Sequence, residues 1–220
     1  MDYLPLLLSF RIAIVATLLA AVLGTLLGAL LRSPRLCGRD LLDALITAPI
    51  VLPPTVLGYY VLVALGRSSR VGQAYEALTG SSIVFTTTGA TIAAFIGALP
   101  MVVKSARAAF EGVDRVYVEA ARTLGASPLR AFVTVELPLA ARGIVAGTML
   151  GFARSLGDFG VTLMVAGDIP GETQTAALAI YDAIQAGRER DALGMILILS
   201  AVAIGLLYAV TKLTRSTGER

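Results

Sequence analysis

The sequence contains no histidine and no tryptophan, and Cys37 is its single cysteine. Without histidine, the chain lacks the side chain that most often shuttles protons or binds metals near neutral pH. One cysteine excludes an internal disulfide and an all-cysteine metal site within one chain. The sequence also has no Gly-x-x-x-x-Gly-Lys-Ser/Thr phosphate loop and no paired-carboxylate pattern typical of a hydrolase. These absences predict a protein with no catalytic residues, no metal site and no cofactor of its own.

Charged residues are also scarce, because they make up 15% of the 220 residues whereas 56% are hydrophobic. The apolar residues occur in blocks of about twenty, the length a helix needs to cross a hydrocarbon core of about 30 Å. We therefore predict an all-α polytopic membrane protein, surrounded by lipid, with a single domain at residues 1–220. The formal net charge of +3 is attributed to loops that set membrane orientation, so no nucleic-acid partner is expected.

Five transmembrane helices are expected. Residues 66–82 form a polar connector with a short helix near 73–78, and residues 104–142 form a charged loop without a spanning run. Residues 167–191 form a further loop with a helix at Ala176–Ala186 that is too short to cross. The expected spans are about residues 12–31, 41–65, 83–103, 143–166 and 192–213.

The first span is expected to stay in the mature protein. Its front, Met1-Asp2-Tyr3, is acidic, and its basic residues follow the apolar run, which is the reverse of a secretory signal. Gly24 and Gly28 stand at a spacing that permits close helix approach, and we interpret them as packing residues rather than a dimer seam. The second span is interrupted by Pro49 and by Pro53-Pro54, which predicts a bend that either lines a pathway or only shapes packing.

Lys and Arg in the loops decide the orientation. With five spans, twelve basic loop residues fall on one side and four on the other. The N-terminus is therefore expected outside, and the loop 104–142 and the C-terminus inside. A sixth span at Ala176–Ala186 would place the C-terminal charges outside, so it is rejected.

The stretch Glu119–Pro138 predicts two short helices joined by a tight turn. Gly125 suits the left-handed residue after a helix end, Ser127 can cap the next helix, and Pro128 fits its first position. Apolar residues in this charged loop must bury against the membrane domain or against a partner, and docking of a partner is the favoured interpretation. These residues are Leu124, Leu129, Phe132, Val133 and Val135.

Arg154 and Asp158 are the charges expected inside the membrane. They stand four residues apart, so one helix would place them on one face. Counted from Gly143, Arg154 lies roughly 16 Å into the span, near mid-bilayer. Either Arg154 supplies positive potential to an anion pathway, or the two residues form a self-neutralising pair that packs helices. The second alternative is favoured.

Several of these residues carry a resemblance to a known family. The cytoplasmic loop signature of bacterial ABC-importer permeases resembles three stretches of this chain: Glu119-Ala120-Ala121, Gly125 and Val135-Glu136-Leu137-Pro138. The signature usually has Ile at the position where this chain has Val135. The runs Val51–Pro54, Ala120–Pro128 and Phe152–Tyr181 are similar to molybdate-importer permeases, with Asp158 in place of Glu.

The resemblance implies a type I ABC-importer permease fold in a bacterial inner membrane. It implies two copies with a pathway between them, two separate ATPase subunits that bind ATP and Mg²⁺, and an extracytoplasmic molybdate-binding protein. A coupling helix around Ala121–Pro128 would dock on each ATPase, and Pro53, Pro54, Arg154 and Asp158 are pathway candidates. The implied coupling residues are Glu119, Ala120, Ala121, Arg122, Gly125, Ala126, Ser127, Pro128, Leu137 and Pro138.

Three alternatives stay open at this point. The cargo of an importer of this kind is molybdate, tungstate or sulfate. The second alternative, an ion-coupled secondary transporter, fits the sequence less well. Such proteins usually carry intramembrane acids or half-helix ion sites in internal repeats, whereas this sequence offers only Asp158, next to Arg154. A membrane scaffold without transport is the third alternative.

Overall fold

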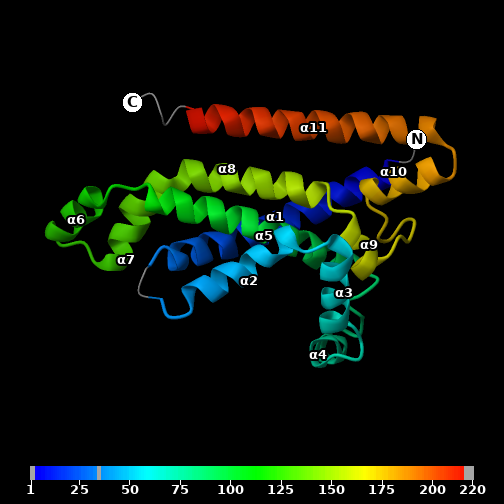
Figure 1. Ribbon diagram of the computed structural model, residues 1–220, viewed down its shortest axis with the longest axis horizontal. Coiled ribbons are helices and arrows are strands. Elements are labelled where there is room, and N and C mark those ends of the chain that lie inside the picture. Colours follow the sequence, from blue (N-terminus) through cyan, green and yellow to red (C-terminus); the bar gives the residue numbers. More distant parts are fainter. Residues whose placement is uncertain (1–2, 34–35, 216–220) are drawn as a thin grey trace.

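The computed structural model describes residues 3–33 and 36–215, and all regular structure in this part of the chain is helical. The longest helices run along one common direction, and the arm formed by residues 54–79 leaves it (Figure 1). The helices are α1 (Leu4–Leu31), α2 (Arg39–Val51), α3 (Pro54–Leu65), α4 (Arg70–Thr79), α5 (Thr87–Glu111), α6 (Arg115–Thr123), α7 (Pro128–Ala131), a π-helical turn η1 (Phe132–Glu136), α8 (Leu137–Leu156), α9 (Gly160–Ala166), α10 (Ala176–Gln185) and α11 (Glu189–Arg215).

The core is formed by α1, α5 and α8, which pack on one another through small residues. A Cβ added to Gly28 of α1 would lie 2.8 Å from the Cβ of Ala106 in α5. A Cβ added to Gly147 of α8 would lie 2.2 Å from the Cβ of Ser105. Without a strong hydrophobic drive between helices in lipid, such close backbone approach provides the packing energy. Gly24 likewise meets Val102 of α5, so the glycine pair of α1 packs inside the chain.

Within the described residues, four helical segments are long and apolar enough to cross a membrane, namely α1, α5, the run Pro128–Leu156 and α11. The pair α2 and α3 reaches this length together, with a bend of 118° between the two helices. The polytopic helical fold is thus confirmed, with five spans when the bent pair counts as one. α11 lies beside α8 and α10, and its apolar segment stays exposed (Figure 1).

Several boundaries differ from the expected ones. α1 begins at Leu4 rather than near residue 12, because Arg11 lies on an exposed face and does not end the helix. Pro49 stays inside α2, and the break falls at Leu52 and Pro53. α5 begins after its cap Thr86 rather than at residue 83, and it extends to Glu111.

The last two spans also differ. The expected fourth span, 143–166, is interrupted, because α8 ends at Leu156 and α9 begins at Gly160. The loop expected at 104–142 is shorter, because α5 extends to Glu111 and α8 already begins at Leu137. The last helix starts at Glu189 rather than near residue 192. α10 has 10 residues, a length of about 15 Å that cannot cross a bilayer.

The two ends of the molecule carry different features. α6, α7 and the C-terminal end of α11 lie at one end, whereas the N-terminal end of α1 lies with α9 and α10 at the other (Figure 1). This placement agrees with an N-terminus and a C-terminus on opposite membrane sides. The end that carries α6 and α7 receives the excess of loop Lys and Arg and is therefore the cytoplasmic end.

Candidate coupling and pathway sites

A sharp corner joins α6 to α7 at the cytoplasmic end. Gly125 adopts a φ of 88°, its N–H donates to the carbonyl of Arg122 at 3.0 Å, and the N–H of Ala126 donates to the carbonyl of Ala121 at 3.0 Å. These two bonds form a Schellman motif, which ends a helix on a left-handed residue. Ser127 Oγ then accepts from the N–H of Arg130 at 3.3 Å, and Pro128 is the first residue of α7. The expected end and start signals are both in place.

The expected coupling helix around Ala121–Pro128 is not one helix. The segment consists of the last turn of α6, a turn, and the first residue of α7. We call residues 119–130 the coupling corner. Within it, Ala121 and Ala126 are half-buried and the remaining expected coupling residues are exposed: Glu119, Ala120, Arg122, Gly125, Ser127 and Pro128. Pro138 is exposed and Leu137 half-buried at the start of α8.

The coupling corner presents apolar side chains to solvent. Leu124 is 89% exposed and Leu129 is 72% exposed, and α6 has no buried residue. By contrast, Phe132 packs against Phe110 of α5, with ring centroids 5.6 Å apart. A protruding corner with two exposed leucines has the character of a docking surface for another protein.

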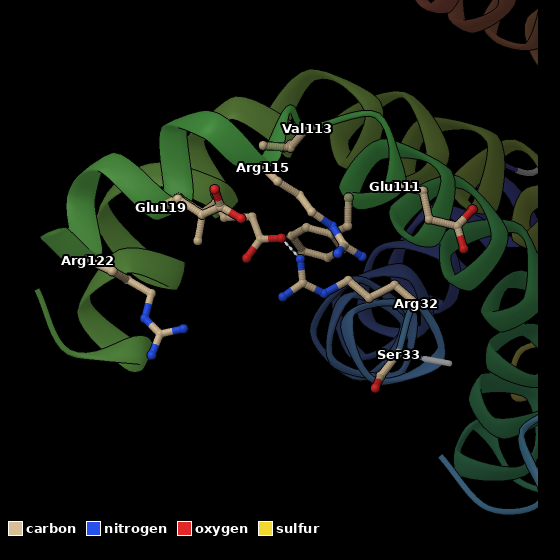
Figure 2. Close-up of a pocket in the computed structure, with 10 residues that line it drawn as sticks. Arg32, Ser33, Glu111, Val113, Arg115, Glu119 and Arg122 are labelled. Atoms are coloured by element: carbon tan, nitrogen blue, oxygen red, sulfur yellow. Dashed lines mark ion pairs between the residues drawn. The ribbon is translucent and has the colours of Figure 1, made fainter. Parts of the chain in front are cut away.

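Behind the corner lies a cavity of about 510 Å³, lined by the ends of α1, α5 and η1 and by α6. Glu136 of η1 is buried and forms an ion pair with Arg32, which follows α1. Figure 2 marks this ion pair with a dashed line, and Arg115 of α6 extends toward Arg32. Burial and the positive charge of Arg115 lower the pKa of Arg32 from its usual value.

Sequence reasoning missed this pair. It interpreted Arg32 only as an orientation charge and gave Glu136 no role. The two residues are far apart in the chain, so no local spacing rule connects them. The sequence offers one signal: Glu136 is a charged residue on the face of its helical segment that is buried against the rest of the chain.

The Arg154–Asp158 pair forms, although across a helix end. Arg154 Nη1 donates to Asp158 Oδ1 at 3.0 Å, and Asp158 lies after the end of α8. Asp158 Oδ2 accepts from the N–H of Thr162 at 3.0 Å and from its hydroxyl at 2.7 Å. The buried carboxylate therefore holds the first turn of α9. The Arg154 side chain remains 33% exposed.

The pathway candidates lie near one another, at the meeting point of two interrupted spans. A Cβ added to Gly160, two residues after Asp158, would lie 2.6 Å from the Cβ of Pro54. Pro53 and Pro54 are exposed. The Arg154 guanidinium lies against Gly97, within the apolar part of α5. The expected depth of Arg154 was counted from Gly143, whereas α8 begins at Leu137 and holds Arg154 in its last turn, so a position near mid-bilayer stays a prediction.

Two other features bear on the site. Arg11 lies in α1, on the exposed face, and was not among the intramembrane charges considered from the sequence. Within the described residues, no group of three or more acidic, cysteine or histidine side chains is placed to hold a metal ion.

The part of the chain that the structure describes is thus a helical membrane domain with a protruding corner and interrupted spans. Residues 20–214 match the family described as "Binding-protein-dependent transport system inner membrane component", and the chain belongs to this family. It is a multi-pass protein of the bacterial inner membrane and a permease subunit of an ABC transporter, a class in which a separate subunit carries the ATPase activity.

The chain is 40% identical to the Molybdenum transport system permease protein ModB of Escherichia coli over 220 residues, covering 100% of this chain and 96% of that protein. It is 36% identical to the Putative molybdenum transport system permease protein YvgM of Bacillus subtilis over 208 residues, covering 94% and 92%. It is 32% identical to the Sulfate transport system permease protein CysT of Salmonella typhimurium, covering 94% and 75%.

Among solved structures, the chain resembles the MetNI methionine ABC transporter in an inward-facing conformation. The TM-score is 0.71 at 16% identity, over 96% of this chain and 94% of that chain. This likeness concerns the fold alone. It confirms the type I importer permease fold.

Proposed function

We propose that this chain is the permease subunit of an ATP-driven importer of molybdate, with tungstate as the chemically similar alternative cargo. The observation that carries the proposal is the exposed coupling corner around Leu124 and Gly125, in a chain that aligns over its full length with a molybdenum permease. Sulfate is the second candidate, since a sulfate permease aligns at the lower identity of 32%.

The complex that we propose contains two copies of this chain, with the pathway between them. Each copy docks one ATPase subunit through the leucines of its coupling corner, and an extracytoplasmic binding protein delivers the oxyanion at the opposite end. The large exposed apolar surfaces of α2, α3 and α11 support the presence of lipid or of a second copy around this chain.

In this mechanism, ATP-driven closure of the two ATPases brings the two coupling corners together and opens the pathway outward. Hydrolysis returns the pathway to the inward-facing state. The chain contributes no chemistry of its own to hydrolysis. The chain instead has two packing states, one inward-facing and one outward-facing. The distance at which the ATPases hold the two coupling corners decides which state has the lower free energy.

Arg154 is proposed to provide positive potential beside the pathway. Its pairing with Asp158 fixes the guanidinium near Gly97, and one third of the side chain is still exposed. An oxyanion that passes this point gains attraction without meeting a full, unpaired charge, which would bind it too tightly. The competing role for Arg154 is to pack helices as one half of a neutral pair.

The test is uptake of labelled molybdate by cells that express the chain with its ATPase and binding protein and lack other molybdate importers. We expect uptake that excess tungstate abolishes and excess sulfate leaves nearly unchanged. Equal competition by sulfate would assign the sulfate alternative. Uptake that persists without ATP and collapses with the ion gradient would indicate a secondary transporter, and failure to copurify an ATPase would indicate a scaffold.

A further inference from the structure

Three elements meet behind the coupling corner in a small cluster of charged and aromatic side chains. Arg32 follows α1, Phe110 lies in the last turn of α5, and Phe132 and Glu136 belong to η1. The Arg32 guanidinium lies 5.5 Å from the ring centroid of Phe110 and 5.9 Å from that of Phe132. One cation is thus held by two rings and by the carboxylate of Glu136.

Glu136 depends on Arg32 because it is 5% exposed. A buried carboxylate whose cation is removed leaves an uncompensated charge, which is strongly unfavourable. Glu111, the other acid at the end of α5, accepts from Arg107 Nε at 2.9 Å and lies 3.5 Å from Arg39 Nη2. Among the described residues, Arg32 is the one cation with a recorded ion pair to Glu136.

The position of this pair matters because η1 is a π-helical turn. It lies between the coupling corner and α8, and the N–H of Leu137 donates to the carbonyl of Phe132 across the wider turn. π-turns inside α-helices are local irregularities that often occur at functional sites. A displacement of the corner can therefore be absorbed by η1 unless a second contact carries it to the membrane helices.

We propose that the Arg32–Glu136 ion pair is that contact, a positioning pair that transmits displacement of the coupling corner to α1 and α5. The inference rests on the proposed coupling of this chain to an ATPase. Through the pair and its two aromatic neighbours, the corner, α1 and α5 move as one unit. Without it, the ATPase can move the corner while the spans lag behind.

The experiment uses the complete transporter in proteoliposomes and measures molybdate imported per ATP hydrolysed. We expect Glu136→Gln to lower this ratio by about two- to thirtyfold, which is what coupling changes of about 0.5–2 kcal/mol between sites correspond to. Copurification of the ATPase is expected to stay at the wild-type level, because the leucines of the corner are untouched. The double variant, Arg32→Gln with Glu136→Gln, should lower the ratio of molybdate imported to ATP hydrolysed by less than the product of the two single effects. This is the expected result when two residues act as one pair.

The matched control is Glu76→Gln, which breaks an exposed ion pair with Arg67, at 3.7 Å, near α4. It should leave the ratio unchanged. Exchange of the two charges, Arg32→Glu with Glu136→Arg, is expected to restore part of the lost ratio and covers the case in which Glu136→Gln does not fold. A wild-type ratio in Glu136→Gln, or a charge exchange no better than Glu136→Gln, overturns the inference. A wild-type complex that shows no ATP-dependent uptake instead overturns the proposed function.

Discussion

Arg154 donates a hydrogen bond to Asp158 at 3.0 Å across the end of α8, and Asp158 in turn holds the first turn of α9 through Thr162. The same carboxylate therefore pairs with Arg154 and caps the helix that follows the interruption of this span. Because the broken pair α2–α3 meets the same region through Pro54 and Gly160, two irregular spans lie side by side near a partly exposed guanidinium.

Replacement of Arg154 by Gln tests the role of its charge. We expect molybdate uptake to fall by about tenfold or more, within the range by which a focused positive potential raises local anion concentration. The measurement is initial uptake rate in proteoliposomes at matched protein amounts. Arg154→Lys, which keeps the charge, is the control and should retain most of the rate. Unchanged uptake in a normally assembled Arg154→Gln transporter would leave the pair with a packing role alone.

The corner leucines are expected to provide the ATPase contact. Leu124→Asp should abolish copurification of the ATPase, because it places a charge in the apolar centre of the interface. The matched control is Leu78→Asp, since Leu78 is 86% exposed on α4 at a distance from the corner. The two variants should express equally. If Leu124→Asp still copurifies the ATPase at the wild-type level, the corner is not the docking surface.

Gly125 tests the geometry of the corner. Its φ of 88° is costly for residues with a Cβ, by roughly 1–2 kcal/mol, whereas no atom would contact the added Cβ. Gly125→Val should therefore weaken ATPase docking while the spans insert normally. Gly125→Asn, a residue that tolerates this conformation, should be milder. Equal copurification for the Val variant and the wild type would refute the coupling role of the corner.

These two tests concern features that the sequence already indicated. The turn residues Gly125, Ser127 and Pro128 act through bonds to neighbours within a few positions, so local rules found them. The break after Leu156 was missed because the apolar runs on both sides were joined into one span, although Gly157, Asp158 and Gly160 between them are poor helix formers. The buried Asp158–Thr162 bonds show where α9 begins. The Arg32–Glu136 pair was missed because tertiary packing alone brings it together. The start of α1 was misplaced because Arg11 was taken to lie outside the span.

Helix packing in the core gives a prediction on stability. Gly147→Val should destabilise the protein by about 1–3 kcal/mol or prevent its accumulation, since overpacking displaces a helix. The reason is the distance of 2.2 Å between an added Cβ and the Cβ of Ser105. Gly205→Val in α11 is the control, because no atom lies within 4 Å of an added Cβ there. Thermal unfolding in detergent measures both; similar midpoints would contradict the packing described for α5 and α8.

The loop between α9 and α10 gives a pH dependence. Burial raises the pKa of Asp168, and the nearby Asp182 adds to the increase, while a hydrogen bond with Gln174 opposes it. A raised folded-state pKa means that stability is lost as pH rises from the unfolded-state value through the folded-state value. Asp168→Asn should therefore raise the melting temperature at about pH 8 more than at about pH 5. Glu172→Gln, in the same loop and exposed, should show no such difference.

The central claim is that this chain converts ATP hydrolysis by a partner into oxyanion import through its coupling corner. The most direct measurement is molybdate uptake by proteoliposomes that contain the chain and its ATPase, with binding protein outside and ATP inside. We predict uptake that requires ATP, persists when ionophores collapse all ion gradients, and is lost in Leu124→Asp. Uptake that follows an ion gradient without ATP, or that Leu124→Asp leaves intact, would contradict the account.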